Sequence, residues 1–320
     1  MSILNTLNFT KLDAGTVQVV DEMTVVPLIG EDRGRVAEPL SLKFERTTSY
    51  GSMEYKNTDE ERVIIVPSNM MVRGSGAQDH AMAGSGIIAA KKTVTFNNAC
   101  CIESSQGGYL HNENNEYDIL PIELRKKLLP ISMRNRKSYD KLWPSITSWL
   151  QGVGVGSSAH LRYFYDNPEF KESLEVFSAE FEPVSGQIGA IILFQERIVG
   201  IEIMPTMLHW DAYWKLLIRG CYGAELIRLQ KLKKIAPAQL QFPDLPDVIT
   251  NPRQLTSVVE KFTDGIRQDI VKKLDLIHLD KVHQLGSVDD LETNLLLTTS
   301  GGGGDFITQN NEPIYLSLVV

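Results

Sequence analysis

The stretch GQIGAIILFQERIVGIEIM, residues 186–204, decides the fold class of this chain. Two apolar runs rich in isoleucine, 186–194 and 197–204, flank the polar pair Gln195 and Glu196. Such runs favour β-strands, and a short polar break between them is typical of a hairpin. A helical pattern follows from about 206 to 233, with Trp210 and Trp214 on its apolar stripe. The stretch therefore predicts a β-hairpin in a sheet against which a helix packs.

The segments on either side of this hairpin complete an α+β pattern. Residues 116–181 are helical in character, and Asn167 followed by Pro168 marks a helix start with Asn as the cap. Residues 252–283 keep a helical apolar period over a length well above the helical mean. Further strands, mostly antiparallel, are expected at 17–20, 23–28, 41–46, 61–71 (ending at Pro67 or forming an edge), 87–90, 93–96, 295–299 and 314–320.

We therefore predict one α+β domain over residues 1–320. It comprises a β-rich part (1–110), a helical insertion (116–181) and an α/β part (182–320) that holds the hairpin, long helices and a terminal strand. The four consecutive glycines at 301–304 cannot be rigid by themselves. They are expected to form a turn, a disordered loop or a contact that becomes ordered on assembly.

Composition excludes several classes of protein. The chain has 320 residues and a net charge of −8, so it lacks the basic footprint of a duplex-binding protein. Its longest apolar runs are too short for a membrane-spanning helix, which needs about 20 residues, and no secretory signal is evident. Cys100, Cys101 and Cys221 are odd in number and two are adjacent, which indicates reduced thiols. We expect a cytoplasmic protein that binds neither duplex nucleic acid nor membranes.

A polar bend follows Gly74 and Gly76 and carries Gln78, Asp79 and His80. Such a bend can present backbone N–H groups to an anion while Gln and Asp offer side-chain hydrogen bonds. It can equally be a polar turn that Asp79 caps. The sequence leaves both interpretations open.

A second polar cluster ends the next strand-like run, where Cys101 and Glu103 lie two residues apart and so face the same side. A carboxylate near a thiol raises the thiol pKa, so Cys101 is better explained as a core residue than as a nucleophile. Glu202 interrupts an apolar strand, and is either at an edge or directed at a site. Glu103 and Glu202 are therefore the candidate general bases. The histidines show no metal-ligand spacing, so no metal is expected.

The segments GAQDH (76–80) and CCIESSQGGY (100–109) resemble the Gly-x-x-Gln-x-Arg and Cys-Val-Glu-x-Gly-Arg-Trp motifs of a domain family of unknown function. That family is associated with ADP-ribosylglycohydrolases, rhodaneses and phosphatase-superfamily proteins. Residues 185–228 resemble its Gly-Gln-x-Gly strand pair and Trp-containing helix, in which Gly186, Gln187 and Gly189 match. The chain departs from the family at His80 and at Gly108-Tyr109, where Arg and Arg-Trp are expected, so two cations are missing.

The resemblance implies a nucleotide-type ligand from NAD or ADP-ribose metabolism. We expect the protein to act in a bacterial cell or, from the Asn-rich character of its sequence, in a phage-infected host. We expect a binding protein for such a metabolite, non-catalytic or weakly catalytic, whose ligand-binding residues are Gly74, Gly76, Gln78, Asp79, His80, Cys101, Glu103 and Gln187. One alternative is a self-assembling homo-oligomer with contacts through the helix 252–283 and the terminal strand 314–320. Another is a hydrolase of ADP-ribosyl linkages that uses Glu103 or Glu202.

Overall fold

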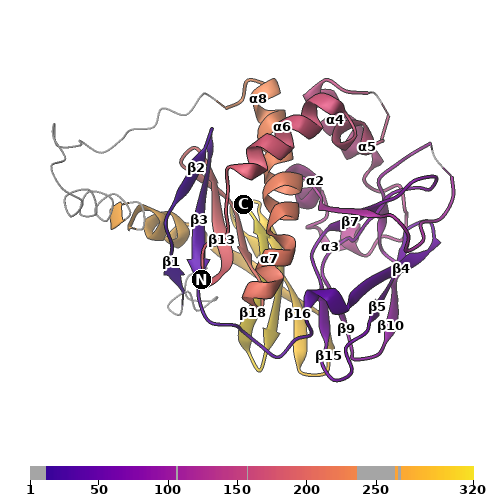
Figure 1. The fold of residues 1–320 in the computed structure, drawn as a ribbon, viewed down its shortest axis with the longest axis horizontal. Helices are drawn as coiled ribbons and strands as arrows, with labels where there is room; N and C mark the ends of the chain where they lie inside the picture. The colour runs from indigo at the N-terminus through magenta and orange to yellow at the C-terminus, as the bar shows by residue number, and fades with distance from the viewer. Residues whose placement is uncertain (1–11, 106, 157, 236–263, 266–267) are drawn as a thin grey trace.

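A large antiparallel sheet of nine strands forms one side of the molecule, in the order β1-β3-β13-β14-β18-β17-β16-β15, with β2 paired to β3 (Figure 1). The computed structural model describes residues 12–105, 107–156, 158–235, 264–265 and 268–320. The strands of this sheet are β1 (Asp13–Ala14), β2 (Gln18–Val20), β3 (Met23–Ile29), β13 (Gln187–Phe194), β14 (Arg197–Ile203), β15 (Leu279–Val288), β16 (Leu291–Thr298), β17 (Gly303–Gln309) and β18 (Glu312–Val319).

The predicted hairpin is β13 with β14, at the centre of this sheet. Phe194 pairs with Arg197, and Gln195 adopts the left-handed φ of 55° that a tight hairpin turn needs. All eight residues of β13 are buried, because β3 and β14 flank it and α7 packs against it. The α+β fold class is therefore confirmed.

Three smaller sheets, on the right of Figure 1, contain the strands of the β-rich part from residue 42 onward and one strand at 116–119, whereas β1, β2 and β3 belong to the large sheet. The predicted run 61–71 ends at Pro67, and a turn in which Asn69 has a φ of 57° leads into the next strand. The small sheets contain β4 (Leu42–Ser49), β5 (Ser52–Asn57) and β10 (Thr93–Phe96); β6 (Ile64–Val66) and β9 (Gly86–Ile88); and β7 (Met70–Arg73), β8 (His80–Ala81), β11 (Cys100–Cys101) and β12 (Glu116–Ile119).

The helical insertion follows β12 and contains α2 (Ile122–Lys127), α3 (Ile131–Arg134), α4 (Trp143–Val153), α5 (Arg162–Tyr165) and α6 (Pro168–Ala179). Asn167 caps α6 as predicted, since its side chain accepts from the backbone N–H groups of Glu169 and Phe170. No helix in the described ranges is both long and apolar enough to cross a bilayer.

The predicted helix over 206–233 is one helical rod of three segments, and it runs in front of the large sheet (Figure 1). It comprises α7 (Met207–Lys215), a π-helical segment (Leu216–Gly223) and α8 (Ala224–Lys231). The wider π-helical turns fall where Gly220 and Cys221 approach the insertion: Tyr165 Oη donates to Gly220 O at 2.6 Å. One hydrophobic core extends from this rod to the small sheets, and includes Tyr55, Ile192 and Leu295.

The predicted helix 252–283 is wrong at its carboxyl end. Residues 268–275 are helical, but Leu279–Val288 is the edge strand β15, and residues 252–263 lie outside the described part. The apolar residues of β15 recur every three positions, which imitates a helical period. The register of β15 against β16 shifts between Leu279 and Lys281 and again between Gln284 and Gly286, and such bulges make a spacing of three compatible with a strand.

The terminal strand β18 lies inside the sheet, because β14 pairs with one of its edges and β17 with the other. It therefore has no free edge for a partner, contrary to the expected oligomer contact. The glycine tract is also more ordered than expected, since Gly303 and Gly304 begin β17 and are buried. Self-assembly itself stays a prediction.

Substitution Gly304→Ala should lower the free energy of unfolding by roughly 1–3 kcal/mol, because overpacking a buried site forces shifts of the backbone. An added Cβ would lie 1.9 Å from the carbonyl oxygen of Ser317. Urea denaturation checks this. The control is Gly286→Ala in β15, where an added Cβ would meet nothing within 4 Å. Equal effects of the two substitutions would contradict the close approach of β17 to β18.

Candidate functional site

The glycine bend and the acidic end of the neighbouring strand lie together and are bonded to each other, without an open hollow between them. Strands β8 and β11 pair antiparallel, with Cys101 opposite His80. Past this pair, Ile102 N donates to Asp79 O at 2.9 Å, and Asp79 N donates to Glu103 Oε2 at 3.4 Å. Asp79 and Glu103 are 1% and 4% exposed, so this meeting point is closed to solvent.

Arg162 holds the bend in place. Its Nε donates to Asp79 Oδ2 at 3.0 Å, and its Nη2 bonds both Asp79 Oδ1 and the carbonyl oxygen of Gly74. Asp79 Oδ1 also accepts from Gly74 N at 3.1 Å. The Gly74 N–H is thus unavailable to an anion, and the geometry is that of a polar turn capped by Asp79. Burial raises the pKa of Asp79 to about 6, against the lowering effect of the Arg162 charge.

His80 and Cys101 are structural in this arrangement. His80 Nδ1 lies 2.9 Å from Gln78 O, and its Nε2 accepts from Gly51 N at 3.1 Å, which assigns the neutral imidazole with its proton on Nδ1. Burial lowers the pKa of His80 to about 4. Cys101 Sγ donates to Glu103 O at 3.0 Å, and burial raises the pKa of this thiol to about 12, so Cys101 is no nucleophile.

Gln78 is 6% exposed, and its Oε1 has no hydrogen-bond partner among the described residues. Gly76 is exposed with a φ of 75°, and its carbonyl oxygen would lie 3.0 Å from a Cβ added to Gly108. The bend therefore lies close against the loop that follows Glu103, at Gly108, whose φ is 104°.

Two further residues complete the site. An isolated antiparallel bridge pairs Glu103 with His160, and places His160 Nδ1 3.5 Å from Glu103 Oε1. His160 Nε2 lies 2.7 Å from Ser105 Oγ. Sequence reasoning missed Ser105, His160 and Arg162. The one available signal was that His160 and Arg162 lie two apart, as Cys101 and Glu103 do, next to a glycine-rich loop.

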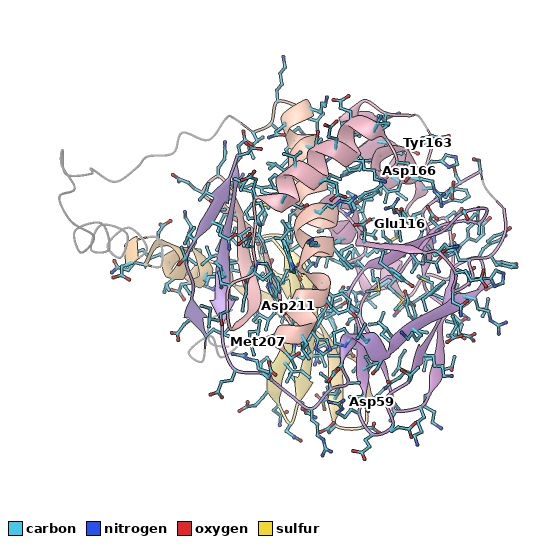
Figure 2. All side chains as sticks on the ribbon, in the orientation of Figure 1. Asp59, Glu116, Tyr163, Asp166, Met207 and Asp211 are labelled. Atoms are coloured by element: carbon cyan, nitrogen blue, oxygen red, sulfur yellow. The ribbon has the colours of Figure 1, made fainter. Side chains whose placement is uncertain are left out.

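The surface beside this cluster is aromatic. Tyr109, Tyr50, Tyr139 and Trp143 form a row, and the centroids of successive rings are 5.4, 5.4 and 5.6 Å apart. Trp143 also lines a cavity of 430 Å³, whose walls include Ser104, Arg136, Lys141, Thr147 and Ala159. Tyr163, whose ring is tilted by 31° against that of His160 at a centroid distance of 4.8 Å, is 49% exposed (Figure 2).

Gln187 and Glu202 do not join this cluster. The Gln187 side chain accepts from Val184 N and donates to Gly189 O, and so bridges the irregular start of β13. Glu202 is fully buried, and its Oε1 accepts from Arg125 Nη1 at 2.8 Å and from Tyr222 Oη at 2.6 Å. The predicted ligand role of Gln187 and catalytic role of Glu202 therefore find no open site around these side chains.

The sequence model described as "ARG and Rhodanese-Phosphatase-superfamily-associated Protein domain" matches residues 11–282. The match covers most of the chain, which therefore belongs to this family, as the segments at 76–80 and 100–109 led us to expect. Strands β16, β17 and β18 lie beyond the matched range. No curated protein and no solved structure matches the chain.

Substitution Glu202→Gln should lower the free energy of unfolding by about 3–5 kcal/mol, since it leaves Arg125 buried without a counter-charge. Arg125 and Glu202 have side chains that are 2% and 0% exposed. Urea denaturation at pH 7 measures the effect. Glu169→Gln is the control, because Glu169 pairs with Lys231 at the exposed surface and should contribute less than about 1 kcal/mol. A loss no larger than that of the control would contradict the buried pair.

Stability should fall in acid through His80. The unfolded chain takes up a proton on this imidazole below about pH 6.5, whereas the folded chain does so only near pH 4. Between these values the unfolded state binds more protons, so the free energy of unfolding decreases as the pH falls, by up to about 3 kcal/mol. Asp79, with its raised pKa, opposes this trend in the same range.

The contribution of His80 is isolated by comparing the wild type with His80→Gln in urea denaturation at several pH values from 4 to 7. The difference between the two free energies of unfolding should shrink as the pH falls. His111→Gln, at an exposed position, should leave the pH dependence unchanged. Parallel curves for wild type and His80→Gln would show that His80 titrates normally in the folded protein.

Proposed function

We propose that this member of the family binds a nucleotide-like metabolite of the NAD or ADP-ribose class, at the surface where the aromatic row meets the 430 Å³ cavity. The observation that carries the proposal is the row itself. Its rings lead from the loop after Glu103 to Trp143, which is both the last ring and a wall of the cavity.

The row offers flat apolar faces to solvent. Tyr109, Tyr50 and Tyr139 are 47%, 40% and 37% exposed, and Tyr50 contacts the other two rings. Stacking of a base on an aromatic side chain is worth about 1–3 kcal/mol and needs no particular base edge. Adenine or nicotinamide is therefore a suitable occupant of this surface.

One exposed cation near the row can bind a diphosphate, and it shares the cavity wall with one carboxylate, Asp140. Arg136 and Lys137 are exposed, and Arg136 lines the cavity. Lys141 is not available, because its Nζ donates to the carbonyl oxygens of Asn98, Arg134 and Arg136. Arg136 can therefore supply the bidentate cation that the chain lacks at His80 and at Gly108.

A larger cavity of 780 Å³ lies at the end of β3, and its charge makes it a poorer candidate. Asp13, Glu31, Asp32 and Glu312 line it, against the single cation Arg33. This excess of carboxylates would repel a diphosphate. The family description names ARG, the ADP-ribosylglycohydrolase, and this association supports an ADP-ribose-type ligand.

Isothermal titration with ADP-ribose, NAD and AMP tests the proposal. The wild type should bind at least one of them, and Tyr139→Ala should weaken binding about tenfold or more through loss of stacking. Arg136→Gln should weaken the diphosphates more than AMP, and make binding less sensitive to salt.

Tyr117→Ala is the matched control, because Tyr117 is 37% exposed like Tyr139 but lies on β12, outside the row. It should leave affinity unchanged. Absence of heat with all three ligands at millimolar concentration would overturn the proposal, as would equal affinities of wild type and Tyr139→Ala.

A further inference from the structure

Ser105, His160 and Glu103 lie in one line of polar contacts. Ser105 Oγ is 2.7 Å from His160 Nε2, and His160 Nδ1 is 3.5 Å from Glu103 Oε1. A carboxylate beside Nδ1 favours the tautomer with its proton on Nδ1. The free lone pair of Nε2 then accepts the hydroxyl proton of Ser105, whose Oγ lies closer to Nε2 than the Ser104 Oγ does at 3.4 Å. This is the arrangement of a base beside a nucleophile.

The backbone fixes this imidazole rather than leaving it on a free loop. Ser104 N donates to Ala159 O at 2.9 Å, and Leu161 N donates to Ile102 O at 3.1 Å, on the two sides of the Glu103–His160 bridge. Arg162, two residues after His160, is bound to Asp79. The Tyr163 ring covers the imidazole at 4.8 Å, with 31° between the planes.

Exposure changes along the line. Glu103 and His160 are each 4% exposed, whereas Ser105 is exposed. The line of contacts therefore begins at the buried carboxylate of Glu103 and ends at the solvent-exposed hydroxyl of Ser105. His80 is the internal comparison, because it is also buried but bonds only backbone atoms, Gln78 O and Gly51 N. A histidine with a purely structural role does not require a hydrogen bond between its Nε2 and a solvent-exposed hydroxyl group.

We propose that Ser105 is a nucleophile for acyl transfer from carboxylic esters, with His160 as its general base and Glu103 as the residue that positions His160. The Ser105 Oγ attacks the ester carbonyl carbon while its proton passes to His160 Nε2. The carbon–oxygen bond to the alcohol breaks, and the alcohol leaves with the proton from His160. Water then attacks the acyl-serine by the same route, and the products are the carboxylic acid, the alcohol and free Ser105.

The 430 Å³ cavity would bind the apolar or aromatic group of the ester. Ser104 and Ala159, the neighbours of Ser105 and His160, form its wall on this side, and Trp143 forms another. An apolar or aromatic group beside Trp143 would bring its ester bond to the Ser104–Ser105 edge. A neutral ester suits this edge, since the carboxylates of Glu103 and Asp79 lie behind it and Arg162 is paired with Asp79. The inference does not depend on nucleotide binding.

Labelling of the full chain with a fluorophosphonate tests the nucleophile, with intact mass and peptide mapping as the readout. Wild type should take up one label on Ser105, and Ser105→Ala should take up none. His160→Gln should react at least about 100-fold more slowly, as expected when a general base is lost. Ser287→Ala, at an exposed position in β15, should be labelled like wild type.

Hydrolysis of p-nitrophenyl acetate and p-nitrophenyl butyrate tests the reaction. Wild type should give a burst of one p-nitrophenol per chain, and its rate should fall in acid, where a protonated imidazole accepts no proton. Glu103→Gln should lower the rate about tenfold and change its pH profile, and Glu103→Asp should restore part of it. Circular dichroism shows that each variant is folded. No label on folded wild type, a label on another serine, or equal rates for wild type and Ser105→Ala would overturn the proposal.

Discussion

The ion pair between Arg162 and Asp79 is the interaction on which the candidate site depends. Burial of the Asp79 carboxylate is unfavourable, as its raised pKa of about 6 records, and the two-pronged contact with Arg162 offsets part of that cost. The partners are 83 residues apart in sequence, so the pair ties the glycine bend to the segment that carries His160. The ion pair thereby helps to hold Glu103 opposite His160 in an isolated β-bridge, although the two residues come from different parts of the chain.

Two buried ion pairs of the same kind join the insertion to the large sheet. Arg125 bonds Glu202, and Arg134 bonds Asp305, which also accepts from Ser68 Oγ at 2.7 Å. Buried pairs of this kind add little net stability compared with apolar packing, but they penalise any other arrangement of the same elements. The Glu202 carboxylate, although it lies inside an apolar strand, is thus explained by its contact with Arg125 of the insertion and not by catalysis.

Local signals made much of the fold predictable from sequence. The hairpin of β13 and β14 and the Asn167 cap of α6 each rest on a few adjacent residues. Strand β15 was missed because its two bulges give apolar residues a helical spacing. The bend at Asp79 and the strand end at Glu103 lie within one short stretch, and so could be paired from the sequence. Ser105 and His160 meet only through tertiary structure, and the spacing of His160 and Arg162 does not reveal that Ser105 is the partner.

All three cysteines are free and fully buried, and burial raises the pKa of each thiol to about 12. Cys100 and Cys101 lie in β11 beside the candidate site, and Cys221 lies in the π-helical segment over the large sheet. An alkylating reagent can therefore reach them only in molecules that have opened. The rate of alkylation at Cys100 and Cys101 therefore reports the opening of one region, and the rate at Cys221 reports the opening of the other. Comparing the two rates would show whether the regions open together or separately.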